Sequence, residues 1–425
     1  PKIYIGTGIE KFISILILFL PLALISGPAL PNVFRFLIIS FSIFIIFKNR
    51  KEFFFKKWYT YVFAIFCIYI TLRSFFMFTE KDSSISEILF SLKSSFFYFT
   101  YFFYSLGIAY LLNKFKNIRL YLTIIIFLVI IFLCIDSLFQ YTFGHNIFGM
   151  LILQPNRASS LFGDELILGS FVQKIMPIAI IMSFFYFDKK IFYKIYPFAV
   201  LLGTLTILLS GERASMLLWI GFVVLFSFFQ DNKIRYKFLT IVSMFLVLFS
   251  TIIFSPKAKD RFIDESKYLF TFEESQEIKI FSIGHANHIS SAMKMFKDNI
   301  LFGQGPNMFR KKCSNSKFLV KHGCTAHPHN IYFQLLSETG IIGFILVFVI
   351  FLYLSFLNIK YILYKLFYPK CFFTKPFVKL LTMLIPIYFM LWPFITTGNF
   401  FNSWVNNIHF LTLGIAISYI PKFNK

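Results

Sequence analysis

Twelve apolar runs, each about as long as a membrane-spanning helix, dominate the 425-residue sequence. The runs are continuously apolar and do not alternate as barrel strands do, and backbone groups in lipid need the internal hydrogen bonds of a helix. We therefore expect an all-α polytopic membrane protein with about twelve transmembrane helices. The expected spans are 12–30, 33–47, 58–78, 86–112, 119–139, 165–187, 193–210, 213–229, 237–254, 331–357, 377–397 and 403–420.

Composition agrees with this class. Apolar residues make up 58% of the chain and charged residues only 14%, whereas about a quarter of a soluble globular chain is charged. These values argue against a soluble enzyme, a disordered tail and a disulfide-rich miniprotein.

The positive charge is distributed unevenly between the loops. The net charge is +23, and the loops of one side with the termini carry 22 Lys and Arg residues, whereas the short loops of the other side carry three. The positive-inside rule then places both termini in the cytoplasm and residues 255–330 in the periplasm. Membrane lipids with anionic headgroups account for this charge, so nucleic acid is not needed as a partner.

This topology divides the chain into three parts. Residues 1–254 hold helices 1–9, residues 255–330 form a large periplasmic loop region between helices 9 and 10, and residues 331–425 hold helices 10–12. The first run could instead be a cleaved signal peptide, but no clear cleavage site follows it and twelve spans fit the alternation of charge.

Three arginines lie on the outer side of the predicted bundle. Arg213 interrupts two apolar runs, Arg261 follows the ninth span, and Arg157 lies in the loop 140–164. A guanidinium at a helix start suits a phosphate group. The alternatives are an Arg213–Glu212 pair within the turn and ordinary interfacial anchoring for Arg261.

A polar stripe begins the tenth span. In a helix that starts near Asn330, this residue, Gln334 and Glu338 lie on one face, which we expect to point into the bundle. His329 precedes the stripe and could act as a base near neutral pH, with a helix-capping role as the alternative.

These residues resemble a known family. His329-Asn330, nine further residues and then Gly340-Ile341-Ile342-Gly343 match the hallmark of the O-antigen ligase and O-antigen polymerase superfamily of bacterial envelope glycosyltransferases. The turn Gly211–Ala214, the segment 302–309, the twelve spans and the large outer loop are similar to that family as well.

The resemblance implies a metal-independent, cofactor-free inverting glycosyltransferase in the bacterial inner membrane. Its donor would be a glycan on undecaprenyl diphosphate, and its acceptor the lipid A core, another lipid-linked glycan or a protein hydroxyl. We favour ligation to the lipid A core because the motif is complete. It implies catalytic roles for His329, Arg213 and Arg261, and we expect substrate contacts from His327, Asn330, Gln334, Glu338 and Arg157.

A zinc site and a transport function are the two alternatives. Zinc could bind among Cys313, His322, Cys324, His327 and His329, although their spacing fits no compact zinc motif. His285 and His288 are expected to face solvent or headgroups. A transporter is the alternative of another class, but charges within the spans are few, namely Arg73, Lys93, Asp136 and Lys174.

The outer loop also predicts a disulfide between Cys313 and Cys324. Cys67 and Cys134 fall within spans and Cys371 falls in a cytoplasmic loop, so two cysteines remain in the oxidising compartment.

Residues 287–300 form an amphipathic stretch in the same loop. We expect a helix on the membrane surface that roofs the site, with a core helix of the loop region as the alternative. Its apolar face would contain Ile289, Ala292, Met293, Phe296 and Ile300.

Overall fold

The computed structural model describes residues 7–48, 58–80, 83–230, 234–269, 283–367 and 374–419. Over these ranges the chain is helical apart from its loops, and the only β-pairing is two isolated bridges, His145–Leu151 and Gln154–Arg157. The all-α class predicted from the sequence is confirmed. Most of the predicted basic loop at 48–57, and Cys371, lie outside the described residues.

Each of the twelve apolar runs contains a helix. Nine described helices, α1–α7, α9 and α14, are long and apolar enough to cross a membrane, whereas α8, α15 and α16 have only 16 or 17 residues. The count of twelve spans therefore stays a prediction. The helices are α1 (Gly8–Ile25), α2 (Ala29–Lys48), α3 (Trp58–Phe76), α4 (Ile85–Lys114), α5 (Asn117–Phe143), α6 (Leu168–Tyr186), α7 (Lys189–Ser210), α8 (Arg213–Phe229), α9 (Ile234–Phe254), α14 (Ile331–Phe367), α15 (Lys375–Met390) and α16 (Ser403–Ser418).

The predicted span 377–397 is wrong at its end. The helix α15 stops at Met390, and residues 391–402 follow an irregular path to the start of α16. Pro393 has no N–H group to continue a helical hydrogen-bond pattern. The Asn330 side chain, just before α14, donates to the carbonyls of Pro393 and Ile395, and the Tyr332 hydroxyl donates to that of Leu391. Apolar composition alone could not reveal this exit from the helix.

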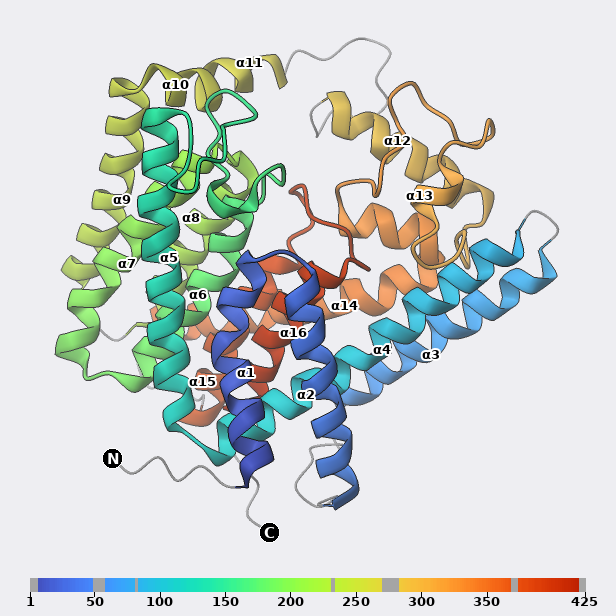
Figure 1. Cartoon of the computed structure of the whole chain (residues 1–425), viewed down its shortest axis with the longest axis horizontal. Coiled ribbons are helices and arrows are strands. Elements are labelled where there is room, and N and C mark those ends of the chain that lie inside the picture. Colours follow the sequence, from blue (N-terminus) through green and yellow to red (C-terminus); the bar gives the residue numbers. More distant parts are fainter. Residues whose placement is uncertain are drawn as a thin grey trace.

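The helices form one bundle around a shared apolar core, in which α16 lies centrally and packs against α4. Figure 1 shows the first turns of α1, in dark blue, at the lower end of the bundle. The loops between α5 and α6 and four shorter helices lie toward the opposite end. These helices are α10 (Pro256–Lys259), α11 (Glu265–Leu269), α12 (Ile283–Asp298) and α13 (Phe309–Lys312).

The helix α12 belongs to a small core within the segment 255–330. Ala292 and Met295 are fully buried and pack with Phe309, Cys313 and Phe318. This packing supports the core-helix alternative for residues 287–300. Contact with a membrane surface stays a prediction, but α12 also packs on α14, and this contact brings it to the histidine motif.

Candidate active site

The helix α14 is broken at Gly340. This residue has φ 66° and ψ −171°, so the carbonyls of Ser337 and Glu338 accept hydrogen bonds from the backbone of Gln304 and Gly305, both at 2.8 Å. A side chain at Gly340 would collide with the carbonyl of Leu301. The glycine of the motif therefore lets the segment 300–305 dock directly on the helix backbone.

Arg73 of α3 holds the same segment from the other side. Its guanidinium donates to the carbonyls of Phe302 and Gly303 at 3.0 Å and 2.6 Å and forms an ion pair with Glu80 at 2.7 Å. The buried charge within this span thus has structural partners, which weakens the case for a transport pathway through it.

His329 is held in a rare backbone conformation just before α14. Its φ of 58° lies in the left-handed region, which costs a residue with a side chain about 1 kcal/mol or more. Thr397 fixes it, because its N–H donates to the His329 carbonyl at 2.7 Å and its hydroxyl accepts from the N–H of Ile331 at 2.9 Å. Asn330 caps the helix by accepting from the N–H of Tyr332 at 2.9 Å.

The predicted polar stripe does point inward, but its hydrogen bonds go to the protein itself. The Glu338 carboxylate accepts from the backbone of Asn307 at 3.1 Å and of Phe309 at 2.9 Å, and from the Gln334 amide at 3.0 Å. The Gln334 oxygen accepts from the N–H of Phe400 at 2.9 Å. These buried side chains anchor two loops beside the motif, and this geometry favours a positioning role over substrate contact.

Four histidine rings gather at the head of α14. The centroid of the His329 ring lies 4.2 Å from that of His327, 4.9 Å from that of His285 and 5.3 Å from that of His288. The prediction that His285 and His288 face solvent or headgroups was wrong, because α12 turns both half-buried rings toward His329.

Burial keeps the imidazoles of His327 and His329 neutral. Desolvation, followed by the charges of His327, His285 and His288, lowers the pKa of His329 to about 3. Desolvation also lowers the pKa of His327 to about 4, although its Nε2–H donates to the Thr397 carbonyl at 3.2 Å. At neutral pH, His329 therefore has a free lone pair that can accept a proton.

The three predicted arginines meet around the turn at Gly211. Arg261 Nε donates to the Gly211 carbonyl at 3.0 Å, and Arg157 Nε donates to the Ser210 carbonyl at 3.3 Å. Arg213 Nη1 contacts the Ser266 hydroxyl at 3.1 Å. Arginines that are far apart in the sequence thus form one basic cluster, which we call the arginine turn.

The arginine turn keeps most of its positive charge. Glu212 does not neutralise Arg213 as the alternative expected, because its carboxylate accepts from the backbone of Gly169 at 2.7 Å and of Ser170 at 3.0 Å. Glu265 pairs with Arg261 and lies 3.9 Å from Arg213, but this carboxylate is 39% exposed. Burial, followed by the charge of Arg261, lowers the pKa of Arg157.

One arginine of the turn acts electrostatically on one of the histidines. The pKa of His285 is lowered by desolvation, then by His288 and then by the charge of Arg213, so this guanidinium lies within electrostatic reach of His285. The arginine turn therefore adds positive potential on the side of the histidine cluster where His285 lies.

The structure joins Cys313 to Cys324 in a disulfide, with their Cα atoms 5.2 Å apart. This bond leaves no thiolates for the zinc site considered from the sequence. Among the described residues, His285, His288 and His329 instead offer three ring nitrogens that lie within 4.8 Å of one another.

The disulfide gives a direct prediction. When the purified protein is alkylated without reduction, we expect the peptides of Cys313 and Cys324 to be linked and unmodified in the mass spectrum. Removing the bond with a Cys313→Ser/Cys324→Ser variant should cost about 3 kcal/mol, because an 11-residue loop is no longer closed in the unfolded chain. Alkylation of both cysteines in the unreduced protein would contradict the bond.

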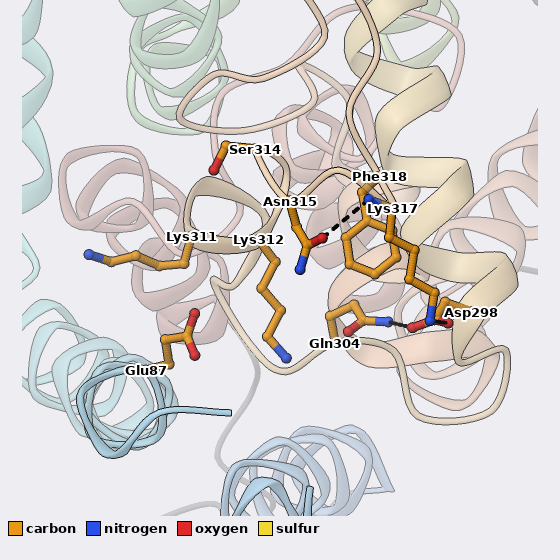
Figure 2. Close-up of a pocket in the computed structure, with 9 residues that line it drawn as sticks. All are labelled: Glu87, Asp298, Gln304, Lys311, Lys312, Ser314, Asn315, Lys317 and Phe318. Atoms are coloured by element: carbon orange, nitrogen blue, oxygen red, sulfur yellow. Dashed lines mark hydrogen bonds and ion pairs between the residues drawn. The ribbon is translucent and has the colours of Figure 1, made fainter. Parts of the chain in front are cut away.

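A polar pocket of about 220 Å³ opens near the N-terminal end of α4, beside the segment 304–318 (Figure 2). Its charged groups are partly paired, since Lys317 forms an ion pair with Asp298, and Gln304 donates to Asp298 at 3.0 Å. None of the predicted site residues lines it. Its lining residues are Glu87, Asp298, Gln304, Lys311, Lys312, Ser314, Asn315, Lys317 and Phe318.

Three residues of the site were missed from the sequence. His285 and His288 are three positions apart, which is the spacing of one helix face, but nothing in the sequence pairs that face with His329. Thr397 lies within a predicted apolar span, and its contact with the motif depends on the irregular segment 391–402.

Comparison with known families agrees with this site. Residues 198–348 match the family described as O-antigen ligase, and this range contains Arg213, Arg261, His329 and Gly340 but not Arg157. No curated protein matches the chain. This match supports the resemblance to the O-antigen ligase superfamily over residues 198–348, and the nine long apolar helices of the described residues are typical of a multi-pass membrane protein.

Proposed function

We propose that the protein transfers a glycan from undecaprenyl diphosphate to an acceptor hydroxyl, and that this acceptor belongs to the lipid A core. The observation that carries the proposal is a neutral, backbone-held His329, packed against His285, which feels the charge of Arg213. These three residues lie within the region that matches the O-antigen ligase family. The site would face the periplasm from the inner membrane. The excess of basic residues in the loops on the side of the termini supports this orientation.

The proposed reaction is a single displacement that needs no metal. His329 accepts the proton of the acceptor hydroxyl, and the oxygen attacks the anomeric carbon of the donor sugar. The bond from that carbon to the diphosphate oxygen breaks, and its electron pair leaves with the diphosphate. Arg213 and Arg261 stabilise the growing negative charge, and attack from the opposite face inverts the anomeric centre.

Deletion of the gene in its native host tests the proposal. The lipopolysaccharide ladder on a gel should lose every capped core, and the wild-type gene should restore it. A core capped by a single repeat would indicate a polymerase, and loss of glycan from a protein would indicate a protein acceptor. An unchanged envelope combined with solute uptake by proteoliposomes would indicate a transporter.

The charge and shape of Arg213 should both matter. We expect Arg213→Ala to reduce transfer about 100-fold, and Arg213→Lys to restore only part of it, because an ammonium group lacks the bidentate fork of a guanidinium. The change should appear mainly in the KM for the lipid-linked donor. Lys267, which is exposed and pairs with Asp264, provides the control variant Lys267→Ala. Full activity in Arg213→Lys would show that charge alone suffices.

The pH profile of transfer should be broad on its acid side. Because the pKa of His329 in the free protein is about 3, kcat/KM for the acceptor, measured at saturating donor, should stay nearly constant as pH falls from about 8 to about 5. Activity disappears as pH falls through the lowered pKa, where the protonated ring can no longer accept a proton. A fall in kcat/KM centred near pH 6.5 would contradict the buried, neutral base.

A further inference from the structure

Resting on the proposed function, we propose that His285 and His288 are additional ligands of the donor diphosphate, and that they take up a proton when this anion binds. The two rings lie next to His329, and they would donate hydrogen bonds to the phosphate oxygens of the donor. Neither residue was assigned a role from the sequence motif.

Position is the first argument. The two histidines are three positions apart on α12, so both rings lie on one face of that helix, and their centroids lie 6.3 Å apart. That face lies against His329, the proposed base, with centroid separations of 4.9 Å and 5.3 Å. A group that approaches the base thus also meets the rings of α12.

Hydrogen bonding is the second argument. The Nδ1 atoms of His285 and His288 are buried, and no protein group in the described part of the chain bonds to either of them. Most buried polar atoms in folded proteins have a partner, and an unpaired one destabilises the fold. Two unpaired ring nitrogens on one helix face, next to a proposed base, indicate a ligand with several acceptor or donor atoms.

Charge decides which ligand is favoured. The groups that perturb His285 are His288 and Arg213, and Arg310 of α13 adds to the positive potential at His327. The pKa of His329 is lowered first by desolvation and then by His327, His285 and His288. Positive neighbours disfavour both a divalent cation and a charged imidazole in the free protein, whereas they favour a diphosphate.

Proton uptake follows from this arrangement. Before the anion binds, desolvation and the charges of His288 and Arg213 lower the pKa of His285 and so favour its neutral form. A diphosphate bound beside the two rings would place negative charge there and favour proton uptake. Binding is therefore linked to protonation and should weaken as pH rises through the pKa values of the complex. A charged imidazole donates from both ring nitrogens, so the unpaired Nδ1 atoms would become donors to the bound diphosphate.

Calorimetric titration of the detergent-purified full chain with inorganic diphosphate and with farnesyl diphosphate tests this inference. Titrations in two buffers of different ionisation enthalpy measure the protons taken up on binding. We expect proton uptake by the wild type at pH 6. The His285→Gln/His288→Gln variant should bind about tenfold more weakly at pH 6 and show no proton uptake, because it loses one or two charge-assisted hydrogen bonds. The difference in affinity should shrink at pH 8.

Controls separate this effect from damage to the fold. His322→Gln replaces an exposed histidine in the same loop region and should leave affinity and proton uptake unchanged. The single variants His285→Gln and His288→Gln should each lose part of the uptake if the double variant is poorly folded. Unchanged affinity and uptake in a double variant with a wild-type melting curve would overturn the proposal.

A metal site is the competing outcome. The purified wild type would then contain stoichiometric zinc, and the double variant would contain none. If a chelator also removed the affinity for diphosphate, the proposal would be overturned. Failure of the proposed function looks different. In that case diphosphate would still bind with proton uptake, but no acceptor would receive a glycan.

Discussion

Replacing His329 with Asn is expected to reduce glycan transfer by about 10²- to 10⁴-fold, which is the usual contribution of a general base. Asn is the better substitution because it accepts the left-handed φ of 58° that this position requires, whereas His329→Ala removes the base and strains the backbone together. The variant should insert in the membrane and accumulate normally. Capped lipopolysaccharide in the host strain, or transfer with purified components, provides the measurement.

His322 offers a matched control for this experiment. It is an exposed histidine with φ 56° in the same loop region, so His322→Asn makes the same chemical change in the same backbone conformation at a solvent-exposed position. His327 needs a separate test, because its ring lies 4.2 Å from that of His329 and could take over the proton. Wild-type transfer in the His327→Asn/His329→Asn double variant would remove both residues from the mechanism.

Gly340→Ala should cause the largest loss of stability. The new methyl group would collide with the Leu301 carbonyl, and the residue would also have to hold a φ of 66°. Left-handed strain and the steric clash together should cost about 3 kcal/mol or more. We expect a lower melting temperature in detergent and reduced accumulation in membranes, with any remaining protein inactive because the segment 300–305 is displaced.

Gly284→Ala is the control for this substitution. Gly284 lies in α12 and has open space where a Cβ would be placed, so alanine should be neutral or slightly stabilising there. Equal stability of the two alanine variants would show that the break in α14 does not depend on glycine.

Hydropathy and motif spacing predicted the helices and the main candidates for chemistry, because both depend on residue type and near neighbours. The period of Asn330, Gln334 and Glu338 correctly placed them on an inward face. This period could not show that Glu338 accepts hydrogen bonds from the backbone N–H groups of Asn307 and Phe309. Nor could it show that Gln334 accepts one from the N–H of Phe400.

What the sequence could not give depends on contacts between distant segments. From the sequence alone, Gly340 is compatible with a continuous helix. The break is visible only in the structure, where the carbonyls of Ser337 and Glu338 accept hydrogen bonds from the segment 300–305. Residues 391–397 are apolar enough to extend α15, yet that helix ends at Met390. Pro393 has no N–H group to donate, and its carbonyl accepts a hydrogen bond from the Asn330 side chain. The positions of His285 and His288 follow from the packing of α12 on α14, which no local pattern encodes.

The short helices have a consequence for how a lipid substrate would reach the site. At about 1.5 Å per residue, a 16-residue helix such as α16 rises about 24 Å, roughly one turn less than a hydrocarbon layer of about 30 Å. If α15 and α16 cross the bilayer as predicted, the irregular segment 391–402 spans the part of the hydrocarbon layer that these short helices do not reach. Irregular backbone at that depth is tolerated only where protein encloses it. Thr397, and the base it holds, would then lie below the headgroups. A polyprenyl carrier could present its phosphates there with its tail fully immersed, which avoids about 0.8 kcal/mol for every methylene group otherwise drawn into water.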